Sequence, residues 1–229
     1  MRNFAPMLAS LLILFALVPQ RLETKLTGKV TLEYLLYVPK KQTAEKLPLI
    51  VYLHGGSARG DMQKLRGMGL PARVEQDSTF PFIVVAPLLP KGEIWTNDGA
   101  LMALIDNVSA KQRVDRNRVY LMGHSMGGRG ALYVAYKHPE RFAAVVAMSA
   151  VSPIPFWSTR LREVPIWYFH GAKDVQAPVA DAEELIQAIQ KSGGDVTYTR
   201  MDDRDHFILD TFDRDDVYEW LLQHRRSGR

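Results

Sequence analysis

The chain has 229 residues and no cysteine, which excludes disulfide bridges, thiolate nucleophiles and cysteine-ligated metals but leaves the compartment open. Its 29 Lys and Arg against 25 Asp and Glu leave a formal net charge of +4. This excess is small and forms no basic stripe with interleaved aromatic residues, so we expect no nucleic-acid partner. A hydrophobic content of 47% at this length fits one α/β domain with a sizeable core.

The N-terminal residues predict a targeting segment. The apolar run 7–18 has the length of a signal-peptide hydrophobic region and is short for a membrane-spanning helix. We expect residues 1–20 to direct export to the periplasm or the medium. The cleavage site is weak, so a retained membrane anchor is the alternative. The folded α/β domain is then expected at residues 28–226.

Short apolar runs alternate with helical patterns along the rest of the chain. Such alternation predicts a mostly parallel, doubly wound sheet with helices on both faces. We expect the first strand to lie at the edge of the sheet. The predicted strands cover residues 30–38, 47–53, 82–86, 119–122, 142–148, 164–169 and 196–199, and the predicted helices cover 99–110, 126–138, 180–191 and 215–225.

The sequence from Gly123 to Gly127, Gly-His-Ser-Met-Gly, fits the G-x-S-x-G pattern of a nucleophile elbow. A serine on so tight a turn has a strained backbone, and a Cβ two residues to either side would collide with the crossing chain. An apolar strand leads into this turn and small residues begin the helix after it. We therefore predict Ser125 as a catalytic nucleophile; the alternative is a structural glycine-rich turn.

A serine hydroxyl is a weak nucleophile, so it needs a base that is itself oriented by an acid. In α/β-hydrolases the three follow in the order serine, acid, histidine, each after a strand. Asp174 and His206 stand in the acid and base positions of that order. The alternatives are a turn-capping aspartate and an exposed loop histidine. Rival acids at 202–205 share the loop of the histidine, so Asp174 has the better topology.

The other histidines are interpreted as structural. We expect His54 to brace the loop after its strand by hydrogen bonds, and His170 to be its counterpart beside the acid. His124 is expected to pack with its polar edge satisfied. His138 is expected to cap a helix, and His224 lies near the tail.

Acyl transfer also requires donors for an oxyanion. The backbone N–H of Met126, at the start of the helix after the elbow, is one candidate. The loop His54-Gly-Gly-Ser57 offers unhindered amides for the second. We predict Gly56 ahead of Ser57; a plain glycine-rich turn is the alternative.

Together these stretches resemble the α/β-hydrolase superfamily, and within it the small esterases of the dienelactone hydrolase-like and phospholipase/carboxylesterase-like group, some of them labelled predicted peptidases. The resemblance implies Ser125 as nucleophile, His206 as base and Asp174 as its partner, with the amides of Gly56 and Met126 as the oxyanion hole. It is carried by Leu53-His-Gly-Gly-Ser-Ala-Arg-Gly-Asp61, Gly123-His-Ser-Met-Gly-Gly128, His170-Gly-Ala-Lys-Asp174 with Pro178, and Asp205-His206 with Tyr218-Glu-Trp-Leu-Leu222.

Two departures narrow the resemblance. Dienelactone hydrolases proper use a cysteine nucleophile, which this chain lacks, so that substrate is not expected. Relatives of prolyl oligopeptidase carry a large gating domain for which there is no room here. Residues 151–163 are too few for a helical lid, which predicts an open site without a large lid, suited to short or soluble esters.

The pocket is expected to include Ser57, Trp95 and Trp157; ordinary packing of the two tryptophans is the alternative. We expect no cofactor and no metal, a small-molecule ester as partner, and membrane contact only through an uncleaved N-terminal segment. The preferred function is a serine carboxylesterase for short-chain or small soluble esters, aryl or feruloyl types included. The alternatives are a serine peptidase of the prolyl-oligopeptidase-like group and a non-catalytic hydrolase-like binding protein.

Overall fold

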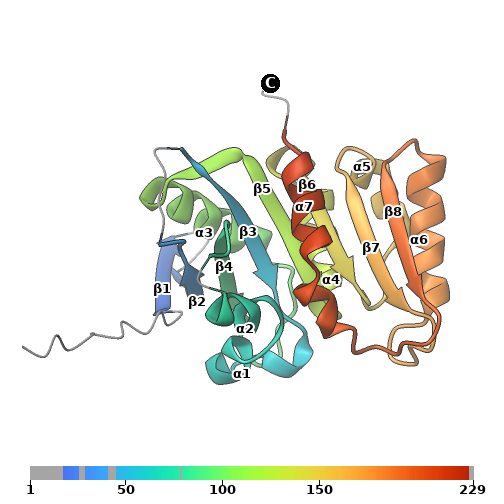
Figure 1. The fold of residues 1–229 in the computed structure, drawn as a ribbon, viewed down its shortest axis with the longest axis horizontal. Coiled ribbons are helices and arrows are strands. Elements are labelled where there is room, and N and C mark those ends of the chain that lie inside the picture. The colour runs from blue at the N-terminus through green and yellow to red at the C-terminus, as the bar shows by residue number, and fades with distance from the viewer. Residues whose placement is uncertain (1–17, 26–28, 41–44, 78, 227–229) are drawn as a thin grey trace, which may run out of the picture.

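A computed structural model describes residues 18–25, 29–40, 45–77 and 79–226. Its strands form one eight-stranded sheet in the order β1-β2-β4-β3-β5-β6-β7-β8 (Figure 1). β1 and β2 run antiparallel to their neighbours, and the six strands β3 to β8 are parallel to one another. The strands are β1 Val18–Lys25, β2 Lys29–Tyr37, β3 Leu47–Leu53, β4 Ile83–Leu88, β5 Val114–His124, β6 Ala144–Met148, β7 Ile166–Gly171 and β8 Val196–Met201.

Helices cover both faces of the sheet. One core contains residues of α3, α4 and α6, and the other contains residues of α1, α2 and α7, which lies across the front of the sheet in Figure 1. No helix in the described ranges has the length and apolar character needed to cross a bilayer. The helices are α1 Met62–Arg66, α2 Gly69–Gln76, α3 Asp98–Lys111, α4 Met126–Lys137, α5 Ser158–Leu161, α6 Val179–Lys191 and α7 Asp215–Gln223, with 3₁₀ turns η1 Gly56–Ala58, η2 Pro139–Arg141, η3 Pro155–Trp157 and η4 Leu209–Asp213.

The continuous apolar runs of the inner strands reflect burial on both faces. In β3, Val51 and Leu53 enter one core, whereas Ile50 and Tyr52 enter the other. Neither face of such a strand is left for polar residues, so the alternation typical of half-buried strands is absent. The predicted α/β fold with a mostly parallel, doubly wound sheet is confirmed.

The N-terminal edge of the sheet differs from the expectation. β1 begins at Val18 and pairs antiparallel with β2, from Val18 opposite Leu36 to Lys25 opposite Lys29. The sheet therefore starts before residue 28, and β1 rather than the strand at 30–38 forms the edge. Residues 20–25 carry no apolar run that would mark a strand, because a paired edge strand needs little hydrophobicity. Residues 1–17, which make up nearly all of the expected targeting segment, lie outside the described residues.

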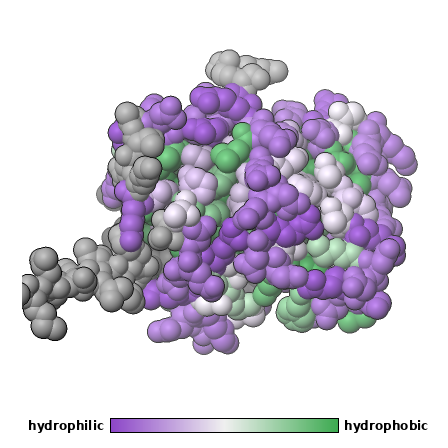
Figure 2. Space-filling view, viewed as in Figure 1, coloured by the Kyte–Doolittle hydropathy of each residue, from purple (hydrophilic) through white to green (hydrophobic). Residues whose placement is uncertain are grey.

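The loops that follow the parallel strands meet at the carboxyl edge of the sheet, which is the general location of sites in such folds. β5 lies between β3 and β6, so the turn after it is flanked by the loops after both neighbours. The segment 151–163 contains only η3 and the single-turn helix α5, and no large lid is present there. Figure 2 shows the molecule from the side of α7, and this view is largely hydrophilic with some hydrophobic surface along its lower edge.

Candidate active site

The turn between β5 and α4 holds Ser125 in a strained conformation, with φ 58° and ψ −122°. The two glycines that flank it meet close backbone. A Cβ on Gly123 would overlap the carbonyl of Gly127, and a Cβ on Gly127 would overlap the carbonyl of Leu53. β3, β5 and α4 can therefore approach this closely only because both positions are glycine.

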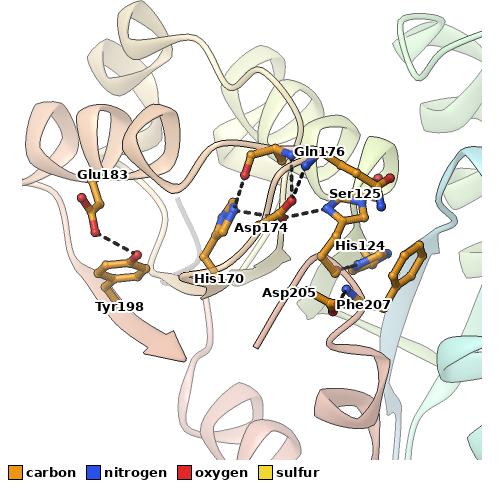
Figure 3. Close-up of polar contacts among 11 residues, drawn as sticks. His124, Ser125, His170, Asp174, Gln176, Glu183, Tyr198, Asp205 and Phe207 are labelled. Carbon is orange, nitrogen blue, oxygen red and sulfur yellow. Dashed lines mark hydrogen bonds and ion pairs between the residues drawn. The ribbon is translucent and has the colours of Figure 1, made fainter. Parts of the chain in front are cut away.

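The structure brings three of the predicted site residues into one hydrogen-bonded chain. His206 Nε2 lies 2.8 Å from Ser125 Oγ, and its Nδ1 lies 2.7 Å from Asp174 Oδ2. His206 and Asp174 are buried, at 4% and 6% exposure. With Nδ1–H donating to the carboxylate, Nε2 has a lone pair directed at the serine hydroxyl. Figure 3 shows the carboxylate of Asp174 beside the ring of His170.

Asp174 is kept ionised by its own loop. Burial opposes its charged form, but N–H groups of Ala177 and Gln176 donate to Oδ1 at 2.8 and 2.9 Å and His206 donates to Oδ2. The hydrogen bonds outweigh the burial, and the pKa of Asp174 lies below its ordinary value. The rival aspartates have other contacts: Asp205 accepts the N–H of Phe207, and Asp202 pairs with Arg200.

His170 is a second, fully buried imidazole on the same carboxylate. Its Nε2 lies 2.8 Å from the carbonyl oxygen of Ala177 and 3.2 Å from Asp174 Oδ2. Its Nδ1 is buried without a hydrogen-bond partner in the described structure. The contacts confirm the expectation that His170 supports the acid loop, since one N–H touches both the loop carbonyl and the acid.

His124 supports the base, as expected of a packed histidine with its polar edge satisfied. Its Nε2–H donates to the carbonyl oxygen of His206 at 2.7 Å, and the two ring centroids are 5.0 Å apart. Burial lowers the pKa of His124 to about 4. A neutral ring next to His206 adds no positive charge against an imidazolium there, and its hydrogen bond fixes the backbone of His206.

The glycine loop after β3 lies against the elbow. A Cβ on Gly55 would sit 3.6 Å from the Cβ of Ser125. Gly56 and Met126 are the first residues of η1 and α4, positions whose N–H groups have no partner within their own helix. Gly56 and Ser57 line the same cavity as Ser125, whereas Met126 lines a cavity on the other side of the elbow.

His54 and Trp95 hold this glycine loop in place. The N–H of Leu89 donates to His54 Nε2 at 3.0 Å, and His54 Nδ1 lies 2.7 Å from the carbonyl oxygen of Gly55. Burial lowers the pKa of His54, consistent with a neutral ring that donates from Nδ1. The indole N–H of Trp95 donates to the carbonyl of His54 at 3.0 Å. The predicted bracing role of His54 is thus confirmed.

The two tryptophans expected in the pocket do not line the cavity of Ser125. Trp95 is only 7% exposed and packs on Gly130, where any Cβ would lie 2.6 Å from its own. Trp157 is 5% exposed and packs on Tyr133 and Tyr136. Trp95 lines a separate cavity together with Met126 and Arg129, whereas Trp157 lines neither that cavity nor the one at Ser125.

The cavity beside Ser125 has a volume of about 180 Å³. Several of its walls were not identified from sequence, because most of them come from η1, α1, the turn before α2 and the loops after β7 and β8, and such short elements leave no periodic signal. Phe207, next to the base, is 56% exposed at its mouth. The lining residues missed were Tyr52, Ala58, Leu65, Met68, Gln176, Phe207 and Leu209.

Comparison with known proteins agrees with this geometry. Residues 90–220 match the family model described as “Putative esterase”, and the chain belongs to that family. It is 33% identical over 130 residues to feruloyl esterase B of Neurospora crassa, which is 51% of this chain and 43% of that protein. It is 32% identical over 103 residues to cutinase est1 of Thermobifida alba, which is 43% of this chain and 32% of that protein. The matched segments thus span less than half of either relative.

Solved structures agree in fold. A thermostable esterase superposes with a TM-score of 0.78 at 26% identity, over 91% of this chain and 63% of that one. An S-formylglutathione hydrolase from Agrobacterium tumefaciens superposes with a TM-score of 0.65 at 20% identity, over 91% and 96% of the two chains. The family supports the expected class of enzyme, a serine hydrolase acting on esters, and the likeness to the S-formylglutathione hydrolase supports the fold alone.

The pKa of His124 generates a prediction on stability. It is about 4 in the folded protein and about 6.5 in an unfolded chain. Between these pH values the unfolded state binds more protons, so stability falls as the pH drops through this window. At about 1.4 kcal/mol per pH unit, the wild type should lose up to ~3 kcal/mol more than His124→Gln between pH 6.5 and 4. Urea unfolding at a series of pH values measures this, and equal losses in both proteins would contradict it.

Proposed function

We propose that this protein is a serine carboxylesterase that hydrolyses small soluble esters through an acyl-enzyme on Ser125. The observation that carries the proposal is the continuous hydrogen-bonded chain from Asp174 through His206 to a serine on a strained elbow. Within the described residues, His206 is the one imidazole that contacts the Ser125 hydroxyl.

In acylation, His206 Nε2 takes the Ser125 proton as Oγ attacks the ester carbonyl. The carbonyl oxygen becomes an oxyanion that accepts hydrogen bonds from the N–H groups of Gly56 and Met126. The ionised Asp174 stabilises the imidazolium through Nδ1–H. The imidazolium then protonates the leaving alcohol as the C–O bond breaks, and the acyl group stays on Ser125.

Deacylation repeats the same route with water. His206 Nε2 removes a proton from a water molecule, whose oxygen attacks the acyl-enzyme carbonyl. The same two amides hold the second oxyanion. As the intermediate collapses, the proton returns from His206 to Ser125 Oγ, and the carboxylic acid leaves.

Two features support small, soluble esters as substrates. The cavity at Ser125 has about 180 Å³, which suits a short acyl or alcohol group better than a long chain. Residues 151–163 provide no large lid, so the site meets solvent without interfacial opening. Aryl esters belong in the test panel because similar proteins are named feruloyl esterase and bis(hydroxyethyl) terephthalate hydrolase.

A fluorophosphonate probe tests the nucleophile. We expect the wild type to be labelled and Ser125→Ala to be unlabelled, since the probe reacts with an activated serine. Asp174→Asn should lower kcat by about 10⁴-fold with the fold intact, because the imidazole loses its orienting acceptor. Circular dichroism controls for folding. A labelled Ser125→Ala, or no labelling of either protein, would exclude this nucleophile, and the second result would favour a non-catalytic binding protein.

The reaction class is tested on the same enzyme. We expect hydrolysis of p-nitrophenyl acetate and butyrate, and of methyl ferulate within an aryl panel, without cleavage of peptide amides. Cleavage of amides at comparable kcat/KM would instead favour a serine peptidase.

Gly56 offers a test of a backbone donor. Proline is well accepted at the first position of a helix, and Gly56 is the first residue of η1, after an extended Gly55. Gly56→Pro thus removes the N–H, whereas Gly56→Ala retains it and places its Cβ in ordinary contact with Arg59. We expect kcat of the proline variant to be about 100- to 1,000-fold below that of the alanine variant. Similar kcat values would assign the donor to another amide.

We also propose that residues 1–20 export the protein, on the basis of the apolar run 7–18. A cut after Val18 would leave nearly all of β1 on the mature protein. We expect the protein in the periplasm or medium, shortened at its N-terminus, as cell fractionation and intact-mass measurement can determine. Full-length protein in the membrane fraction would favour the anchor, and full-length protein in the cytosol would exclude both.

A further inference from the structure

The nucleophile elbow separates two cavities. Ser125 lines the first, whose other walls include Tyr52 and Leu65 from the core on the α7 side of the sheet. Met126, the next residue, lines a second cavity of about 220 Å³ on the side of α3 and α4. Since liquid water occupies about 30 Å³ per molecule, this volume holds a group of several heavy atoms. The walls of the second cavity are Ile94, Trp95, Met126, Arg129, Gly130, Val151 and Ser152.

The second cavity adjoins the reacting centre. The N–H of Val151 lies 3.4 Å from the carbonyl oxygen of Ser125, and that of Arg129 donates to the same oxygen at 3.0 Å. The amide of Met126, proposed above as an oxyanion donor, begins the helix between the two cavities. An ester carries two substituents, one on each side of its reacting C–O bond; the cavity at Ser125 can hold one, which leaves the neighbouring second cavity for the other.

Arg129 is the single charged residue in that wall. Its Nε–H donates to the carbonyl oxygen of Ser152 at 3.2 Å, and its guanidinium carbon lies 5.1 Å from the ring centroid of Trp157. No carboxylate of the described residues lies within ion-pair distance of it. The carbonyl of Ser152 thus holds the guanidinium at Nε, and the ring of Trp157 holds it on one face. Its two terminal nitrogens remain available as donors.

The position of the Arg129 charge near the start of α4 does not stabilise the folded protein. Arg129 lies about one turn into α4, close to the positive end of the helix dipole, and the first turn contains no acidic residue to offset it. A guanidinium has the planar fork that matches a carboxylate. An anion in the second cavity would supply the missing counter-charge, and Ile94 and Val151 offer apolar contact to the chain that carries it.

We propose that the second cavity is a subsite for a carboxylate-bearing arm of the ester substrate, with Arg129 binding the carboxylate. The proposal rests on the esterase function above and narrows its substrates to half-esters of dicarboxylic acids or esters of hydroxy acids. Both classes present one carboxylate a few methylene groups from the scissile carbonyl. They differ in whether the acyl or the alcohol part carries it.

Matched ester pairs test the proposal in a pH-stat. Monoethyl adipate against ethyl hexanoate places the charge on the acyl part, and 4-butanoyloxybutanoate against butyl butyrate places it on the alcohol part. We expect wild type to favour the anionic ester in one pair. In Arg129→Gln the anionic-to-neutral ratio of kcat/KM should fall about tenfold or more, the scale of one charge-assisted hydrogen bond. Arg129→Lys, which keeps the charge but not the fork, should lose less.

The ratio is independent of the folded fraction, because both esters are assayed on one sample. Arg160→Gln is the matched control: Arg160 lies on α5, donates to the carbonyl of Lys137 and lines neither cavity. It should leave both ratios unchanged. Raised ionic strength should lower the wild-type ratio by screening.

An anionic-to-neutral ratio of kcat/KM in Arg129→Gln equal to that of the wild type would overturn the proposal. If kcat/KM falls equally on both esters, the result would also overturn it, because it would assign Arg129 to the oxyanion or to the fold. Hydrolysis of neither pair, together with absent fluorophosphonate labelling of Ser125, would instead overturn the esterase function itself.

Discussion

The close approach of β3, β5 and α4 is the constraint on which the rest of the site depends. Two glycines allow it, since a side chain at Gly123 or Gly127 would overlap carbonyl groups of the crossing backbone. The approach forces Ser125 to a positive φ and presents its hydroxyl above the sheet. It also sets the glycine loop after β3 against the serine. A single packing event thus positions both the nucleophile and the amides proposed to stabilise the oxyanion.

The remaining groups are held by the buried hydrogen bonds of three further histidines. The ring of His124 donates to the backbone carbonyl of His206, and the ring of His54 accepts the N–H of Leu89. The ring of His170 contacts the carbonyl of Ala177 in the acid loop. Burial lowers the pKa of His124 and His54, so these two rings stay neutral near pH 7. Ionised Asp174 therefore faces the imidazole of His206 without a competing fixed cation on either of these rings.

The sequence predicts the buried central strands and the long helices well, and it predicts the edge strand, the short helices and the pocket walls poorly. β3 and the helix α6 follow from apolar runs and periodicity, and the order of Ser125, Asp174 and His206 follows from fold topology. β1 was not predicted because a paired edge strand needs few apolar residues. α1 and α2 were not predicted because they are short. Trp95 was expected beside Ser125, but the sequence does not show that its ring seats on Gly130, donates to the carbonyl of His54 and lines the other cavity. Contacts between distant loops carry no local signal.

The order of the strands has a consequence for how the chain becomes active. The nucleophile and the glycine loop lie on central strands, but Asp174 and His206 follow β7 and β8, the last two strands in sequence and the far edge of the sheet. During synthesis the elbow can form while the base is still absent. A serine without its base is only a weak nucleophile. In the proposed mechanism, the chain therefore has no base until its final strand docks, and hydrolytic activity would report completion of folding rather than formation of the core.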